Sequence, residues 1–315
     1  MTQGTRFFTY ERLATQMAIA PTEPTLPLAG EFWHEGELAI LVGQAGVGKS
    51  AMAFQIAFGI ATGTTTAQGF EVGLNPRAVL ILDHENDDRD IRSRIEPDYE
   101  VPHNIWRADI SPDVALENLD GYLTHLEHLI LSLGVSVVII DNILWLTFGS
   151  SKQDIHKEAA NLMRGLMRLR KKLDVSILVV AHRNKADHGY LDISSVAGSS
   201  NVTRFVPAVF GMAHFPGDET KIYFKQIKFG RGRAAKWTTN SVLTGLLQMD
   251  NYLKVVTDAS DLVRERDLFK ESGDTKSDMV RELLASEPNK SDNQIAEQIG
   301  VSKQLVNKLR KSMAS

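Results

Sequence analysis

The 315-residue chain contains no cysteine, which excludes disulfide bridges, thiolate nucleophiles and cysteine-based zinc sites. It also lacks long apolar runs: the longest, such as residues 135–140, fall far short of the roughly 20 residues needed to cross a bilayer. The first 16 residues hold no apolar core of a signal peptide. We therefore expect a soluble, cytoplasmic protein that has no membrane partner.

A large excess of charge of one sign is missing as well, since the formal net charge is −4. The whole chain is thus not a basic coat for nucleic acid. The charge is unevenly distributed, however: residues 275–315 carry 7 Lys and Arg against 5 Asp and Glu, and the remainder carries 28 against 34. A locally basic tail on an acidic body can still bind DNA. The 43% of hydrophobic residues excludes a mainly disordered chain.

Strand-like and helix-like segments alternate along most of the chain. Short apolar runs are separated by stretches with helical spacing, which predicts an α/β fold with a mostly parallel central sheet. The expected strands are 37–43, 77–83, 135–141, 175–182, 208–215 and 221–229, followed by a terminal hairpin over 243–256. The expected helices are 50–63, 87–95, 113–133 and 156–173.

The composition divides the chain into four parts. Residues 1–29 form a lead-in with a short helix and a Pro-rich connector, and are a candidate oligomerisation arm. Residues 30–257 form the core, and the charged, turn-rich residues 258–274 form a linker. Residues 275–315 are a small all-α unit.

Residues 43–50 match the motif G-x-x-x-x-G-K-[ST] between an expected strand and an expected helix, the context in which this phosphate-binding loop occurs. Its glycines let backbone N–H groups turn toward phosphate oxygens, and the helix N-terminus adds a positive dipole end. Lys49 is expected to reach the β- and γ-phosphates of ATP, and Ser50 to bind Mg²⁺. The predicted nucleotide-binding residues are Gly43, Gln44, Ala45, Gly46, Val47, Gly48, Lys49, Ser50 and Ala51.

Three later strands end in polar residues, and the carboxyl ends of parallel strands face the ligand crevice. Residues 83–87 are rich in carboxylates, and the residues alone support two interpretations equally. Either Glu85 activates the attacking water, or the segment is a cluster that caps the N-terminus of the next helix. Asp141 ends a buried run, where the second carboxylate that supports Mg²⁺ is expected. His182 can hydrogen-bond a γ-phosphate or a water. The catalytic candidates are therefore Glu85, Lys49 and His182, and the metal candidates are Ser50 and Asp141.

The order of these motifs resembles the RecA-like ATPases, and among them the plasmid replicative-helicase (RepA-like) branch. The resemblance covers about residues 30–256 and includes the Gly-Ser-Ser segment 198–200 and the basic strand ending at Phe229-Gly230. It implies a RecA-like core that binds ATP and Mg²⁺, with Glu85 as the catalytic base. It also implies a homo-oligomeric ring, such as a hexamer, or a filament, with ATP at the subunit interfaces.

In such assemblies an Arg or Lys of the neighbouring subunit reaches the γ-phosphate. The resemblance does not select one residue for this trans-acting finger, and a solvated basic hairpin is the alternative. The candidates are Lys221, Lys225, Lys228, Arg231 and Arg233.

Residues 280–312 resemble the helix-turn-helix of bacterial DNA-binding proteins. Helices are expected over 275–286, 291–299 and 302–312, with Ser291 and Ser302 as N-caps and Gly300 ending the second helix. Lys and Arg of the third helix can pair with phosphates, and its amides can read base edges. The DNA-binding candidates are Lys303, Gln304, Asn307, Lys308, Arg310 and Lys311; the alternative is a three-helix cap that docks on protein.

These features predict Mg²⁺-dependent ATP hydrolysis coupled to DNA binding, in an oligomeric plasmid- or phage-type helicase or a replication accessory ATPase. The alternative is an ATP-switched, DNA-binding regulator of transcription or replication that unwinds nothing. A small-molecule phosphotransferase is disfavoured, because the sequence has no clear lid or acceptor site.

Overall fold

The computed structural model describes residues 12–19, 25–73, 75–110, 119–142, 155–183, 189–196, 202–229, 235–271, 276–288 and 290–313. Within these ranges the main sheet has nine strands in the order β11-β10-β9-β8-β3-β7-β6-β4-β5. Neighbouring strands run parallel from β8 to β5, and β9, β10 and β11 add as antiparallel strands. The predicted α/β class and mostly parallel sheet are therefore confirmed.

The strands lie close to their predicted positions. Their bounds are β3 (Leu38–Gly43), β4 (Val79–Asp83), β5 (Ile105–Ala108), β6 (Val137–Asp141), β7 (Ser176–His182), β8 (Ala208–Phe215), β9 (Asp218–Lys228), β10 (Val242–Asp250) and β11 (Tyr252–Val263). The edge strand β5 was not predicted, because its residues are only partly buried and form no apolar run.

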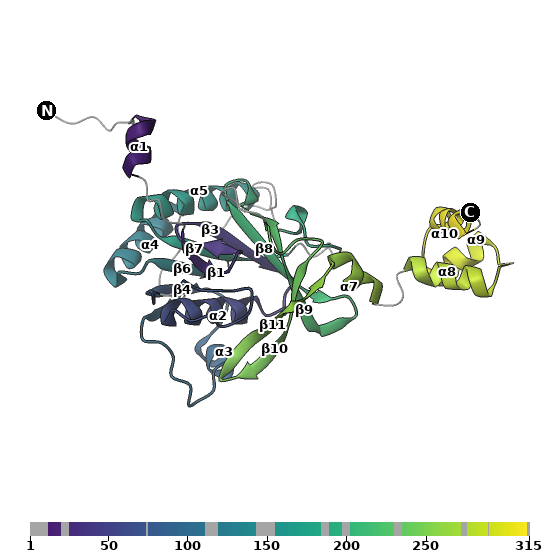
Figure 1. The fold of residues 1–315 in the computed structure, drawn as a ribbon, viewed down its shortest axis with the longest axis horizontal. Coiled ribbons are helices and arrows are strands. Elements are labelled where there is room, and N and C mark those ends of the chain that lie inside the picture. Colours follow the sequence, from purple (N-terminus) through teal and green to yellow (C-terminus); the bar gives the residue numbers. More distant parts are fainter. Residues whose placement is uncertain are drawn as a thin grey trace.

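Helices cover both faces of the sheet, with α2 (Lys49–Thr62) on one face and α4 (Leu119–Leu133) and α5 (Ile155–Leu173) on the other (Figure 1). Successive strand residues point to opposite faces. In β3, Leu41 packs in the core beneath α2, whereas Ile40 packs in the core beneath α4 and α5. Burial on both faces explains why these strands are uninterrupted apolar runs in the sequence. The first part of the predicted helix 113–133 lies outside the described residues.

The core begins earlier than predicted. The short helix in the lead-in is present as α1 (Leu13–Ile19), but β1 (Pro27–Ala29) and β2 (Trp33–His34) form a small hairpin that was not predicted. Leu28 and Trp33 of this hairpin are buried in the core beneath α2. The first strand of this hairpin therefore belongs to the core rather than to the predicted lead-in, which was expected to end at residue 29.

The predicted linker over residues 258–274 is wrong for its first part, because β11 continues to Val263 and α7 (Glu265–Glu271) follows. The cause is a buried polar cluster centred on the Glu265 carboxylate. This carboxylate accepts hydrogen bonds from the Lys225 ammonium, the Tyr223 hydroxyl and the Leu191 backbone N–H. A fully buried carboxylate is stable only when it is paired in this way, so these contacts hold α7 on β9.

The C-terminal residues form three helices around a small core of their own, apart from the sheet in Figure 1. They are α8 (Lys276–Ser286), α9 (Asp292–Ile299) and α10 (Lys303–Met313), close to the predicted bounds. The Ser291 hydroxyl accepts a hydrogen bond from the Gln294 N–H, and the Ser302 hydroxyl from that of Leu305. Gly300 ends α9 at φ 69°, a left-handed conformation that favours glycine. The helices and caps are thus confirmed, whereas their assignment as a DNA-binding helix-turn-helix stays a prediction.

The described helices include none that is both long and apolar enough to cross a membrane.

Candidate nucleotide-binding site

The phosphate-binding loop connects β3 to α2 at the carboxyl edge of the parallel strands. Gly46 and Gly48 have φ angles of 79° and 92°, a region that side chains disfavour. At Gly43 an added Cβ would lie 2.7 Å from the backbone oxygen of Met212 on β8. Because α2 begins at Lys49, its first backbone N–H groups have no partner within the helix and are free to bind an anion.

The Lys49 ammonium lies within this loop. It donates a hydrogen bond to the Gln44 carbonyl at 2.7 Å and lies 3.4 Å from Nδ1 of His182, at the end of the neighbouring strand β7. Burial lowers the pKa of Lys49, and the carboxylates of Asp141 and Glu85 oppose this effect. The loop therefore holds a desolvated cation, for which a phosphate group is a suitable counter-ion.

Asp141 is a buried carboxylate at the end of β6. Burial raises its pKa to about 6; Ser50 and Lys49 oppose this rise, and the carboxylates of Asp83 and Glu85 reinforce it. Within the described residues neither Asp141 carboxylate oxygen has a hydrogen-bond partner of normal geometry. A buried carboxylate beside a serine hydroxyl is a donor set that fits Mg²⁺.

No group of three or more acidic or histidine side chains that could hold a metal occurs in the described part of the chain. A Mg²⁺ ion at Ser50 and Asp141 would therefore take most of its ligands from water and phosphate, as this ion commonly does.

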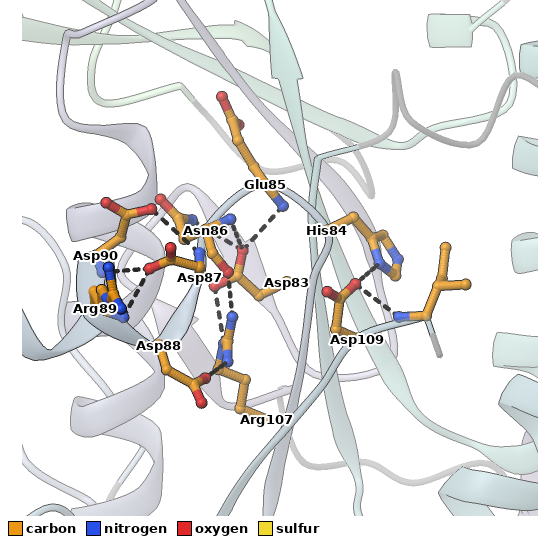
Figure 2. Close-up of polar contacts among 11 residues, drawn as sticks. Asp83, His84, Glu85, Asn86, Asp87, Asp88, Arg89, Asp90, Arg107 and Asp109 are labelled. Atoms are coloured by element: carbon orange, nitrogen blue, oxygen red, sulfur yellow. Dashed lines mark hydrogen bonds and ion pairs between the residues drawn. The ribbon is translucent and has the colours of Figure 1, made fainter. Parts of the chain in front are cut away.

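Asp83 and Glu85 have different environments, as Figure 2 shows. The Asp83 side chain is fully buried beside Arg107, whereas that of Glu85 points away from this cluster and is 39% exposed. One Glu85 carboxylate oxygen accepts a hydrogen bond from the Asn142 amide at 3.1 Å, and the other lies 3.9 Å from Nε2 of His182. Of the two acids, Glu85 is therefore the one placed to meet a ligand.

The N-cap alternative for this acidic segment also has a structural basis, but in other residues. The Asp87 carboxylate accepts hydrogen bonds from the backbone N–H groups of Arg89 and Asp90 at the start of α3 (Asp88–Ser93). Capping thus accounts for Asp87 and not for Glu85.

Most of the predicted residues line a cavity of about 210 Å³, whereas Gly43, Gln44, Val47 and Asp141 are not among its lining residues. Its lining consists of Ala45, Gly46, Gly48, Lys49, Ser50, Ala51, Glu85, Asn86, Arg94, His182, Leu247 and Leu253. Four of these lining residues were not predicted from the sequence, namely Asn86, Arg94, Leu247 and Leu253.

The two leucines come from the β10–β11 hairpin. A hydrogen bond from the Leu253 N–H to the Arg94 carbonyl joins this hairpin to the end of α3. Such a contact between distant segments leaves no local signal in the sequence.

The candidates for the trans-acting finger are placed differently from one another. The ammonium of Lys225 is buried against Glu265 and the Leu191 carbonyl, so this candidate is wrong: it cannot reach another subunit. Lys221 is exposed and forms an ion pair with Asp218. Lys228 donates to the Thr203 carbonyl, and partial burial lowers its pKa. Arg231 and Arg233 lie outside the described residues.

The DNA-binding candidates on α10 fall into two groups. The side chains of Lys303, Gln304, Lys308 and Lys311 are on exposed positions. Asn307 and Arg310 instead both donate hydrogen bonds to the Asp292 carboxylate, and these bonds lower the pKa of Asp292. Arg310 also donates to the carbonyls of Pro288 and Lys290. These two residues therefore hold α10 to the start of α9.

The fold and the loop together define a P-loop ATPase with a RecA-like core. Residues 7–188 match the AAA domain family, which is more than half of the chain, and the protein belongs to this family. A KaiC-like protein from the hyperthermophilic archaeon Pyrococcus horikoshii OT3 has a similar fold, with a TM-score of 0.50 and 15% sequence identity. The similarity covers 71% of this chain and 90% of that one. No curated protein matches the sequence.

Proposed function

We propose that the protein hydrolyses ATP with Mg²⁺ and couples hydrolysis to DNA binding, as a helicase or replication accessory ATPase of the RepA-like type. The observation that carries the proposal is the convergence of Lys49, Glu85 and His182 on one cavity beside the phosphate-binding loop. Asp141 lies within electrostatic reach of Lys49 and Glu85, where a metal-bound phosphate needs it.

The proposed roles follow from the contacts. The loop N–H groups and Lys49 bind the β- and γ-phosphates, and Ser50 and Asp141 would hold Mg²⁺. When bound, Mg²⁺ would neutralise charge on the phosphate oxygens. Glu85 takes a proton from the attacking water while the bond between the γ-phosphorus and the bridging oxygen breaks, which yields ADP and inorganic phosphate.

Two neighbours of Glu85, Asn142 and His182, have proposed roles in the same reaction. The Asn142 amide fixes the orientation of the Glu85 carboxylate through its hydrogen bond. His182 lies within 4 Å of both Lys49 and Glu85, so it is placed to respond to the presence of a γ-phosphate.

Three further residues that line the cavity are suited to contact the base of the nucleotide. Arg94, Leu247 and Leu253 line it with one guanidinium and two apolar side chains. A guanidinium can stack on an aromatic heterocycle, and the leucines offer apolar contact.

We also propose that the site is completed by a neighbouring subunit in a ring. The partial exposure of Glu85 supports this arrangement, because a second protein surface would exclude water during hydrolysis. The remaining finger candidates are Lys221, Lys228, Arg231 and Arg233.

The exposed cations of α10 are proposed to bind DNA phosphates. We expect a triple substitution of Lys303, Lys308 and Lys311 by Gln to weaken duplex binding by about tenfold or more. The slope of log affinity against log salt should fall by about 0.9 for each DNA phosphate that the variant no longer neutralises. The matched control replaces three exposed cations of α5, Lys157, Arg168 and Lys171, by Gln. Equal affinity of the α10 variant and the wild type would make the three-helix unit a protein-docking cap.

ATP turnover with single-stranded and duplex DNA separates the helicase from its alternative. Strong stimulation by single strands supports a motor, and an unwinding assay follows. Slow turnover without stimulation, together with nucleotide-dependent binding of one duplex, would instead support an ATP-switched regulator.

A further inference from the structure

Arg107, on the edge strand β5, contacts three parts of the segment that carries Glu85 (Figure 2). Its Nε donates to the Asp83 carboxylate at 3.0 Å, at the end of β4. One terminal nitrogen donates to the Asn86 carbonyl, and the other to the Asp88 carboxylate at 2.8 Å, at the start of α3. A single guanidinium therefore joins the strand end, the loop and the following helix.

The Asp83 carboxylate is the inner partner of Arg107, and it shapes the loop directly. Its Oδ1 accepts hydrogen bonds from the backbone N–H groups of Glu85 and Asn86 and from the Asn86 amide, at 2.9 to 3.3 Å. Its Oδ2 is bound by Arg107. Oδ1 therefore fixes the backbone at Glu85 by hydrogen bonds, and Oδ2 is paired with the guanidinium of Arg107.

Burial decides which of these contacts matter. The Asp83 side chain is fully buried, so removal of its cationic partner would leave a desolvated carboxylate with no opposite charge bound to it. The Asp88 side chain is 88% exposed, and ion pairs of exposed groups contribute little. The Asp83 and Asn86 contacts should therefore carry the effect of Arg107.

We infer that Arg107 is a positioning residue for ATP hydrolysis: it neutralises Asp83 and clamps the loop so that Glu85 is held toward the cavity. This inference rests on the proposed role of Glu85 as the base. Arg107 lines none of the nucleotide cavity, so its effect must pass through the loop. A displacement of about 1 Å at a catalytic group can lower the rate by about 100-fold.

The test compares Arg107→Gln and Arg107→Lys with wild type in the full-length protein, through kcat for ATP and the affinity for a fluorescent ATP analogue. Arg77→Gln is the matched control. Arg77 precedes β4, at the end of the strand opposite Asp83, is similarly exposed, and forms an ion pair with Glu35. We expect Arg107→Gln to lower kcat by about 10- to 100-fold, with affinity changed less than about threefold. Arg107→Lys should restore part of the rate, since it keeps the charge beside Asp83 but not the planar fork.

Two results would overturn the inference. One is wild-type kcat in Arg107→Gln; the other is a parallel loss of kcat and affinity that Arg107→Lys does not relieve, which would indicate a purely structural role. If Arg107→Gln does not fold, Arg107→Lys takes its place, and an equal loss of kcat and affinity in that variant has the same consequence. Glu85→Gln, measured alongside, separates this failure from failure of the proposed function, because wild-type turnover in that variant would remove Glu85 as the base.

Discussion

Glu85→Gln is expected to bind ATP about as well as the wild type and to lower turnover by roughly 100- to 10,000-fold, the usual range for loss of a general base. The amide keeps the size of the side chain and an acceptor for the Asn142 amide, but it cannot take a proton from water. Single-turnover hydrolysis and binding of a fluorescent ATP analogue measure the two quantities separately.

Glu100→Gln is the control for this change, because Glu100 is 85% exposed at its side chain and lines none of the cavity. It should behave as wild type. Turnover at the wild-type rate in Glu85→Gln would move the base elsewhere.

Asp141→Asn should have two opposite effects: the protein without ligands becomes more stable, and Mg²⁺-dependent turnover is lost. The pKa of Asp141 rises from 3.8 to about 6 in the folded state, mainly through burial. Between pH 3.8 and about 6, Asp141 binds more protons in the folded state than in the unfolded state. The contribution of Asp141 to stability therefore falls as the pH rises through this range. Above this pH range the buried carboxylate is ionised and destabilises the folded state by roughly 3 kcal/mol, as the difference between the two pKa values gives.

Removal of this charge should therefore raise the free energy of unfolding by about 1–3 kcal/mol at pH 8, and by less at pH 5. Urea unfolding without Mg²⁺ at both pH values measures this difference, with Asp98→Asn at an exposed position as the control. Turnover with Mg²⁺ should fall at least about 100-fold. A variant that is less stable than wild type at pH 8, or that still hydrolyses ATP normally, would contradict the account of Asp141.

Local patterns in the sequence predicted the parts of the structure that depend on local physics. The central strands are buried on both faces and appear as uninterrupted apolar runs, so β3, β4, β6 and β7 could be placed. The phosphate-binding loop was predictable because its glycines and Lys49 occupy a fixed spacing between a strand and a helix. The caps of α9 and α10 were predictable because each involves neighbouring residues.

Contacts between distant segments had no such signal. Lys225 was proposed as an exposed finger because its strand is basic, but Glu265, from a segment predicted to be a linker, is its buried partner. Arg107 lies on an edge strand without an apolar run, and its bond to Asp83 depends on the pairing of β5 with β4. Leu247 reaches the nucleotide cavity only because a late hairpin folds back toward the loop.

Phosphate release from ATP in the presence of Mg²⁺, measured for wild type and Lys49→Ala, tests whether the phosphate-binding loop serves ATP hydrolysis. Thermal unfolding of both proteins confirms that each is folded. We expect steady release by the wild type and at least about a 100-fold lower rate in the variant, because the ammonium within the loop is gone. Equal release from the two folded proteins would show that Lys49 of the phosphate-binding loop is not needed for ATP hydrolysis.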